Sequence, residues 1–267
     1  MAKTIAICNQ KGGTGKTTTT INLASALAVL GKKILIVDMD PQGNASSGVG
    51  VNKNEIKESL YEVLIHRISV NQGLIKTNFD NLDIIPCNIN LTGAEIELVG
   101  VLSRETRLKK ALEPVKDNYD FVFIDSPPSL GLLTLNALVA ADSILVPIQC
   151  EFYALEGVSQ LLNTITLVKD GLNPDLHIEG VLMTMADFRT NLTNEVISEI
   201  KNYFKDKVYK SIIPRNIRLS EAPSFGKPIN FYDKGSLGSL KYKELAEEFL
   251  LINKGRAVGA EEFQNGK

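Results

Sequence analysis

The chain has 267 residues, of which 44% are hydrophobic and 22% charged, as in ordinary globular proteins. Its net charge of −2 excludes a general polycation, and three widely spaced cysteines without a CxxC pair exclude a disulfide framework and a zinc finger. The apolar run at the N-terminus is too short for a secretory leader, and no later stretch is apolar enough to span a membrane. We therefore expect a protein of the reducing cytoplasm.

Apolar runs of strand length alternate with helix-length stretches along the chain. Continuous apolar runs predict strands that are buried on both faces, as in a parallel sheet covered by helices. Their order predicts one α/β domain over residues 1–252, a doubly wound, mostly parallel sheet flanked by helices, followed by a polar, frayed tail over 253–267. The expected strands are 4–8, 33–37, 82–85, 121–124, 143–148, 178–183 and 211–213, and the expected helices are 17–30, 104–115, 130–140, 155–169, 191–204 and 241–252.

A glycine-rich segment lies between the first expected strand and the first expected helix. Its glycines let backbone N–H groups wrap an anion, and the helix N-terminus adds its positive dipole end. In such a P-loop Lys16 would reach the β- and γ-phosphates, Thr17 would hold Mg²⁺ and Thr18 would assist at the α-phosphate of ATP. A glycine turn that merely caps the helix is the alternative. The predicted nucleotide loop comprises Lys11, Gly12, Gly13, Thr14, Gly15, Lys16, Thr17 and Thr18.

The loop departs from the common P-loop pattern at its start. Gln10 stands where the first glycine is usual, and a second lysine, Lys11, opens the loop. The pattern KGGTGKT resembles the deviant Walker A ATPases, which include the ParA/Soj partition ATPases, the MinD division-site ATPases and the nitrogenase iron protein. The resemblance implies that Lys11 contacts phosphate across a nucleotide-sandwich homodimer, whereas a solvated loop charge is the alternative.

Two of the expected strands end in acidic residues, where parallel sheets bind ligands. Asp38 and Asp40 follow the strand 33–37, and Asp125 ends the strand 121–124 as a Walker B acid that would hold Mg²⁺. The resemblance implies that Asp40 orients the attacking water, and Asp38 is placed to support the water shell of the metal. Polar turns are the alternative for both residues. Lys11 and Lys16 would neutralise the charge that develops on the phosphates. Together with the acidic residues, they predict a slow, Mg²⁺-dependent ATPase.

Segments later in the chain discriminate among the deviant Walker A families. Positions 126–136 lack the cluster-binding cysteine of the iron protein, and the C-terminus lacks the basic amphipathic helix of MinD. The blocks 149–157, 181–196 and 213–229 resemble ParA/Soj proteins, and this resemblance runs from Lys3 to about Ile252. It implies that Pro214 and Asn216 contact the adenosine part of ATP.

The C-terminal third of the chain is basic. Residues 189–243 hold 11 Lys or Arg and 5 Asp or Glu, a net charge of +6. The resemblance implies that the ATP-bound dimer binds double-stranded DNA through this region without sequence preference. Arg189 and Arg218 are the leading candidates, although a solvated basic face is the alternative. Further candidates are Lys201, Lys205 and Lys227.

The resemblance as a whole implies a nucleoid-associated ATPase that partitions a chromosome origin or a plasmid. A ParB-type centromere-binding partner would stimulate hydrolysis, and no membrane would be involved. Two other classes remain open, a MinD-like or cargo-positioning ATPase and a P-loop biosynthetic ligase.

Overall fold

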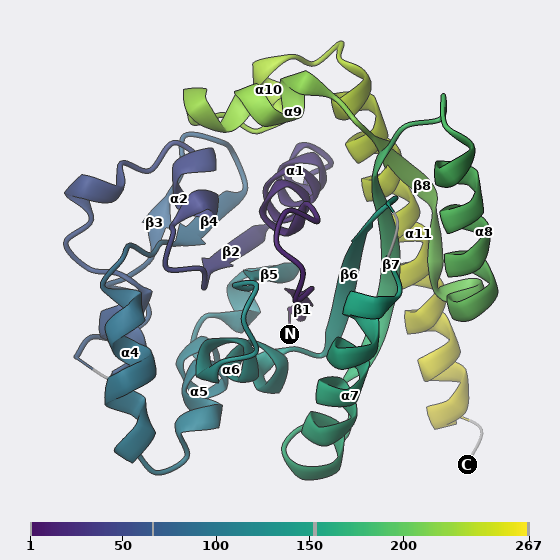
Figure 1. Ribbon diagram of the computed structural model, residues 1–267. Helices are drawn as coiled ribbons and strands as arrows, with labels where there is room; N and C mark the ends of the chain where they lie inside the picture. The colour runs from purple at the N-terminus through teal and green to yellow at the C-terminus, as the bar shows by residue number, and fades with distance from the viewer. Residues whose placement is uncertain (1, 66, 152–153, 266–267) are drawn as a thin grey trace.

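The computed structural model describes residues 2–65, 67–151 and 154–265, and within them a central sheet of eight strands (Figure 1). The strands lie in the order β3-β4-β2-β5-β1-β6-β7-β8, and all neighbouring pairs are parallel except β3 and β4. The predicted α/β class with a mostly parallel sheet is therefore confirmed. The strands are β1 (Lys3–Ile7), β2 (Ile34–Asp38), β3 (Ile75–Lys76), β4 (Leu82–Ile85), β5 (Phe121–Asp125), β6 (Ser143–Gln149), β7 (His177–Ala186) and β8 (Val208–Pro214).

Helices cover both faces of the sheet, which is why its central strands are mostly apolar. All residues of β2 and β5 are buried. Successive side chains of a strand point to opposite faces, so Leu35 packs in one hydrophobic core and Ile36 in the other. The helices are α1 (Lys16–Val29), α2 (Asn44–Gly48), α3 (Leu60–Leu64), α4 (Leu91–Glu97), α5 (Arg107–Leu112), α6 (Leu132–Ala140), α7 (Glu156–Gly171), α8 (Asn191–Phe204), α9 (Ile217–Glu221), α10 (Ile229–Tyr232) and α11 (Leu237–Asn265).

The two cores belong to different helices. One core joins the sheet to α1 and α11 through side chains such as Leu27 and Phe249. The other core joins it to helices α3 to α8, for example through Leu108 and Leu161. Figure 1 shows α1 and α11 on one side of the sheet and α4 to α7 on the other. This arrangement leaves the carboxyl ends of the strands free to form a site.

The structure differs from the expected elements mainly at short segments and at the C-terminus. The expected helix 104–115 consists of a 3₁₀ turn, Arg104–Thr106, followed by α5. The short elements β3, α2, α3, α4, α9 and α10 differ from the expectation, because segments of two to seven residues show no clear periodicity. Helix α11 continues to Asn265, through most of the segment expected to be a frayed tail. That segment contains no proline to stop a helix; the domain boundary at 252 stays a prediction.

A helix needs a long and largely apolar stretch to cross a membrane. Across the described part of the chain, none of the helices combines the length and the apolar character that a membrane crossing requires.

Candidate functional site

A hollow of about 260 Å³ lies at the carboxyl ends of the central strands, next to the N-terminus of α1. It gathers most of the predicted loop together with the predicted catalytic carboxylate. Three of its lining residues, Asn44, Pro128 and Met185, are not predicted from the sequence, because they come from other segments of the chain. The hollow is lined by Gly12, Gly13, Gly15, Lys16, Thr17, Thr18, Asp40, Asn44, Pro128 and Met185.

Two glycines give the loop its shape. Gly13 and Gly15 have φ angles of +75° and +86°, the left-handed region that glycine adopts without strain. Between them Thr14 is buried, and its carbonyl oxygen accepts a hydrogen bond of 2.8 Å from Thr184 Oγ1 on β7. The loop is therefore anchored to a strand 170 residues away in the sequence.

Lys16 begins α1 and points into the hollow with only 7% of its surface exposed. Its Nζ donates a hydrogen bond of 3.3 Å to the carbonyl oxygen of Lys11. Burial lowers the pKa of Lys16, while the attraction of Asp125 opposes that shift. A buried ammonium group with few partners favours an anion, and the N-terminus of α1 acts in the same direction.

Thr17 and Asp125 lie together, as predicted for a magnesium site. Thr17 Oγ1 donates to Asp125 Oδ2 at 2.7 Å, and Thr20 Oγ1 donates to Asp125 Oδ1 at 3.0 Å. Asp125 is fully buried, and burial together with the charge of Asp38 raises its pKa. A buried carboxylate beside a hydroxyl group fits Mg²⁺, which prefers oxygen ligands and takes the remainder from water and substrate phosphates.

No larger metal-binding cluster of His, Cys, Asp and Glu side chains was found in the described ranges. Thr17 and Asp125 would therefore be the protein's contribution to the magnesium site. When bound there, Mg²⁺ would neutralise negative charge on the phosphates.

Asp40 and Asp38 differ in their surroundings although they are two residues apart. Asp40 is half-buried and lines the hollow. Asp38 is fully buried and does not line it, and its oxygens accept hydrogen bonds from Ser46 and from the Asp40 N–H. The structure thus gives Asp38 protein donors rather than the expected contact with the water shell of a metal.

A second pocket of about 150 Å³ adjoins the hollow and shares Gly15, Thr18 and Met185 with it. Both predicted adenosine contacts, Pro214 and Asn216, line this pocket. The adjacency therefore places them where a nucleoside attached to phosphates in the hollow would extend; their role stays a prediction. The other lining residues are Thr184, Ile213, Arg215, Leu219, Ser220 and Tyr242.

Lys11 directly precedes the lining residues Gly12 and Gly13 but does not line the hollow itself. Its ammonium group forms an ion pair with Glu151, and both side chains are more than one third exposed. The two loop lysines thus have different surroundings, since Lys16 is buried and lines the hollow, whereas Lys11 is partly exposed and pairs with Glu151.

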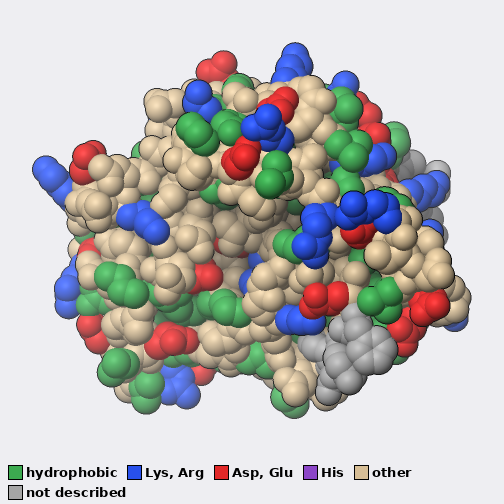
Figure 2. Space-filling view, turned by 45° about the horizontal axis from the view of Figure 1, so that its top comes forward, with side chains coloured by type: hydrophobic (Ala, Val, Ile, Leu, Met, Phe, Trp, Pro, Cys, Tyr) green, Lys and Arg blue, Asp and Glu red, His purple; other side chains and the backbone are tan. Residues whose placement is uncertain are grey.

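The predicted DNA-binding arginines are exposed and are held by acidic neighbours. Arg189 forms a two-pronged pair with Asp187, at 2.8 Å from Nε and 2.6 Å from Nη2. This pair lowers the pKa of Asp187 to about 2. Arg218 contacts Glu221 at 2.8 Å and Asp233 at 3.5 Å. Figure 2 shows Lys and Arg side chains grouped beside the central hollow of this face.

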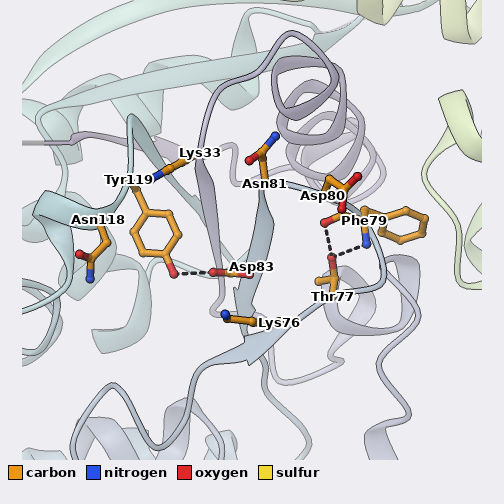
Figure 3. A pocket seen from close by; sticks show the side chains of 9 residues that line it. All are labelled: Lys33, Lys76, Thr77, Phe79, Asp80, Asn81, Asp83, Asn118 and Tyr119. Atoms are coloured by element: carbon orange, nitrogen blue, oxygen red, sulfur yellow. Dashed lines mark hydrogen bonds between the residues drawn. The ribbon is translucent and has the colours of Figure 1, made fainter.

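Another polar hollow, of about 370 Å³, lies where β2, β4 and β5 begin (Figure 3). Lys33, Asn81 and Tyr119 come from the segments that precede these strands, so the hollow faces the edge opposite the phosphate site. Tyr119 donates a hydrogen bond of 2.8 Å to Asp83 Oδ2. None of the predicted site residues lines this hollow.

Comparison with known proteins agrees with this geometry. The family model described as an AAA domain matches residues 2–178. The sporulation initiation inhibitor protein Soj of Bacillus subtilis is 60% identical over 248 residues, which cover 93% of this chain and 98% of the relative. The chain belongs to the ParA/Soj family. The chromosome-partitioning ATPase Soj of Treponema pallidum is 50% identical over 250 residues, 94% of this chain and 98% of the relative.

A solved structure from Mycobacterium smegmatis also matches this ParA/Soj chain. It is described as cobyrinic acid a,c-diamide synthase with bound ATP analog and magnesium, and the match has a TM-score of 0.84 at 36% identity. The match covers 95% of this chain and 96% of that one. This ParA/Soj protein is accordingly an ATPase of the partitioning type that uses ATP and Mg²⁺, on a P-loop fold.

Proposed function

We propose that this ParA/Soj protein is an ATP-switched homodimer that binds double-stranded DNA without sequence preference and partitions a chromosome origin or a plasmid. ATP would join two protomers, and the joined state would bind DNA. Slow hydrolysis, stimulated by a ParB-type partner, would then separate the two protomers and release the DNA. The protein would accordingly act in the cytoplasm on the nucleoid.

The placement of Lys11 carries the proposal. Its side chain does not line its own phosphate hollow, and its ammonium group pairs with the partly exposed Glu151. An exposed ion pair contributes only about 0–1 kcal/mol, so a phosphate group can displace the carboxylate. Two protomers that face each other across their hollows would each offer Lys11 to the nucleotide of the other.

The hollow contains what slow ATP hydrolysis requires. Lys16 would neutralise charge that develops on the phosphates, and the N–H groups of the loop would hold the phosphate oxygens. Asp40, at the edge of the hollow, would orient a water molecule toward the terminal phosphate. Phosphoryl transfer to water needs no protein nucleophile, and a single positioned carboxylate supports a slow reaction.

The basic third of the chain supports DNA binding. Contacts from Arg and Lys to phosphates do not depend on the base sequence of the DNA, and they weaken as the salt concentration rises. Arg189 and Arg218 are exposed, and their acidic neighbours could exchange for DNA phosphates at small cost. Two copies in one dimer would double the number of phosphate contacts, so dimerisation by ATP would switch affinity for DNA.

The test is to measure the molecular mass of the full chain by light scattering, with ATP or ADP, and then its cosedimentation with plasmid DNA. Asp40→Ala is included because it should keep the ATP state populated. We expect a dimer with ATP only, and DNA binding only by that dimer. A chain that stays monomeric with ATP, or that binds DNA equally with ADP, would overturn the proposal.

The name of the M. smegmatis structure supports a second candidate, a biosynthetic P-loop enzyme. Such an enzyme would turn ATP over with a small substrate and without DNA. A membrane-cycling ATPase of the MinD type would instead sediment with liposomes in the presence of ATP. Measuring turnover and cosedimentation with DNA and with liposomes side by side distinguishes the three classes.

A further inference from the structure

The main chain of Asp40 is held by hydrogen bonds on both of its sides. Its peptide N–H donates to Asp38 Oδ1 at 3.3 Å. Its carbonyl oxygen accepts from the Cys87 thiol at 2.8 Å and from the Gly43 N–H at 2.8 Å. Two side chains from different strand ends therefore fix the peptide groups that flank this residue.

Ser46 links these two side chains. Its N–H and its hydroxyl each donate to Asp38 Oδ2 at 2.7 Å. The same hydroxyl accepts a hydrogen bond of 3.1 Å from the N–H of Cys87. Ser46, Asp38 and Cys87 are all fully buried, so water cannot substitute for any of these partners.

Cys87 is suited to act as a donor in this network. Burial raises the pKa of its thiol, and the nearby charge of Asp38 raises it further, so the proton stays on sulfur. Packing fixes the position of the thiol as well. A Cβ atom on Gly43 would lie 2.8 Å from the carbonyl oxygen of Cys87, so the loop after β2 and the segment after β4 are in close contact.

We propose that Ser46 and Cys87 are positioning residues for ATP hydrolysis, which hold the main chain of Asp40 so that its carboxylate stays at the edge of the phosphate hollow. Neither side chain lines that hollow. They act through Asp40, and the inference rests on the proposed role of Asp40 in orienting water. A displacement of about 1 Å in such a group can reduce a rate up to about a hundredfold.

The test compares three single variants of the full chain. Cys87→Ala removes the thiol donor, and Cys87→Ser restores a donor of similar size. Cys150→Ala removes another buried thiol, which lines neither the phosphate hollow nor the adjoining pocket. We expect kcat to fall about tenfold or more in Cys87→Ala. The ATP dissociation constant should change less than twofold, Cys87→Ser should recover most of kcat, and Cys150→Ala should keep it.

Ser46→Ala tests the link between the two side chains. Because Ser46 and Cys87 belong to one network, the double variant Ser46→Ala/Cys87→Ala should lose less activity than the product of the two single losses. A merely structural role would lower the melting temperature and the activity of Cys87→Ala and Cys150→Ala alike. Equal kcat in those two variants, or no recovery in Cys87→Ser, would overturn the inference.

Asp40→Ala, measured in the same series, distinguishes the role of Asp40 from the positioning role of Ser46 and Cys87. If Asp40→Ala keeps turnover, the proposed role of Asp40 fails and the positioning role fails with it. If Asp40→Ala loses turnover while Cys87→Ala matches Cys150→Ala, only the positioning role is wrong.

Discussion

Asp38 and Asp125 occupy paired positions at the ends of the neighbouring strands β2 and β5, and both carboxylates are fully buried. Hydroxyl groups bind both of them, from Ser46 in one case and from Thr17 and Thr20 in the other. Burial raises the pKa of each, and for Asp125 the charge of Asp38 raises it further. Burial and mutual repulsion therefore disfavour negative charge on this pair of adjacent acids when no cation is near.

The first prediction concerns pH and Asp125. Its folded-state pKa lies above the unfolded value, so its contribution to stability is complete at low pH and is lost as pH rises through the raised pKa. Without nucleotide, Asp125→Asn should therefore melt higher than the wild type at pH 8, by about 3 °C or more. The difference should shrink toward pH 5.

Differential scanning calorimetry at pH 5, 6, 7 and 8 measures this difference. Addition of ATP and Mg²⁺ should raise the melting temperature of the wild type but scarcely that of Asp125→Asn, because the variant lacks the carboxylate for the metal. A melting-temperature difference between Asp125→Asn and the wild type that does not change with pH would contradict the prediction that ionisation of buried Asp125 destabilises the fold.

The second prediction concerns Lys11. Lys11→Ala should keep ATP affinity within about threefold, because Lys11 does not line its own hollow and its amine pairs with Glu151. Dimer formation with ATP should be lost, as measured by light scattering. Lys57→Ala removes an exposed lysine elsewhere and should dimerise normally. If Lys11→Ala forms a dimer with ATP at the same protein concentration as the wild type, the amine does not bridge protomers.

The third prediction concerns Asp40. Asp40→Ala should bind ATP as tightly as the wild type, since the carboxylate lies at the edge of the hollow and would repel phosphate if anything. Its rate of phosphate release should fall about a hundredfold or more, because the variant lacks the carboxylate that would orient the attacking water. Radiolabelled ATP under single-turnover conditions measures binding and hydrolysis in one sample. Turnover at the wild-type rate would remove Asp40 from the mechanism.

The fourth prediction concerns the arginines and their acidic partners. Arg189→Glu with Arg218→Glu should abolish ATP-dependent DNA binding and leave ATP binding unchanged. Lys109→Glu with Lys110→Glu makes the same charge change on α5 and should retain DNA binding. Asp187→Asn frees Arg189 from its pair and should raise DNA affinity. Fluorescence anisotropy at several salt concentrations reports each result; undiminished affinity in the arginine double variant would place the DNA surface elsewhere.

Much of the fold and the loop could be predicted from the sequence, because both depend on local spacing. Runs such as 34–37 and 121–124 are apolar at every position, which indicates buried parallel strands. The glycines around Thr14 and the lysine after Gly15 determine an anion-binding turn before a helix by conformational preference alone. The adenosine contacts Pro214 and Asn216 came from family resemblance, not from spacing.

The partners of the site residues depended on the tertiary structure. Glu151 pairs with Lys11 across 140 positions, Thr20 reaches Asp125 across 105, and Cys87 reaches Asp40 across 47. These contacts follow from the strand order, which sets β4 beside β2, β2 beside β5 and β5 beside β1. Local sequence determines which segments become strands and turns, whereas the packing of the whole sheet decides which strand ends become neighbours, because that choice depends on burying all the apolar faces at once.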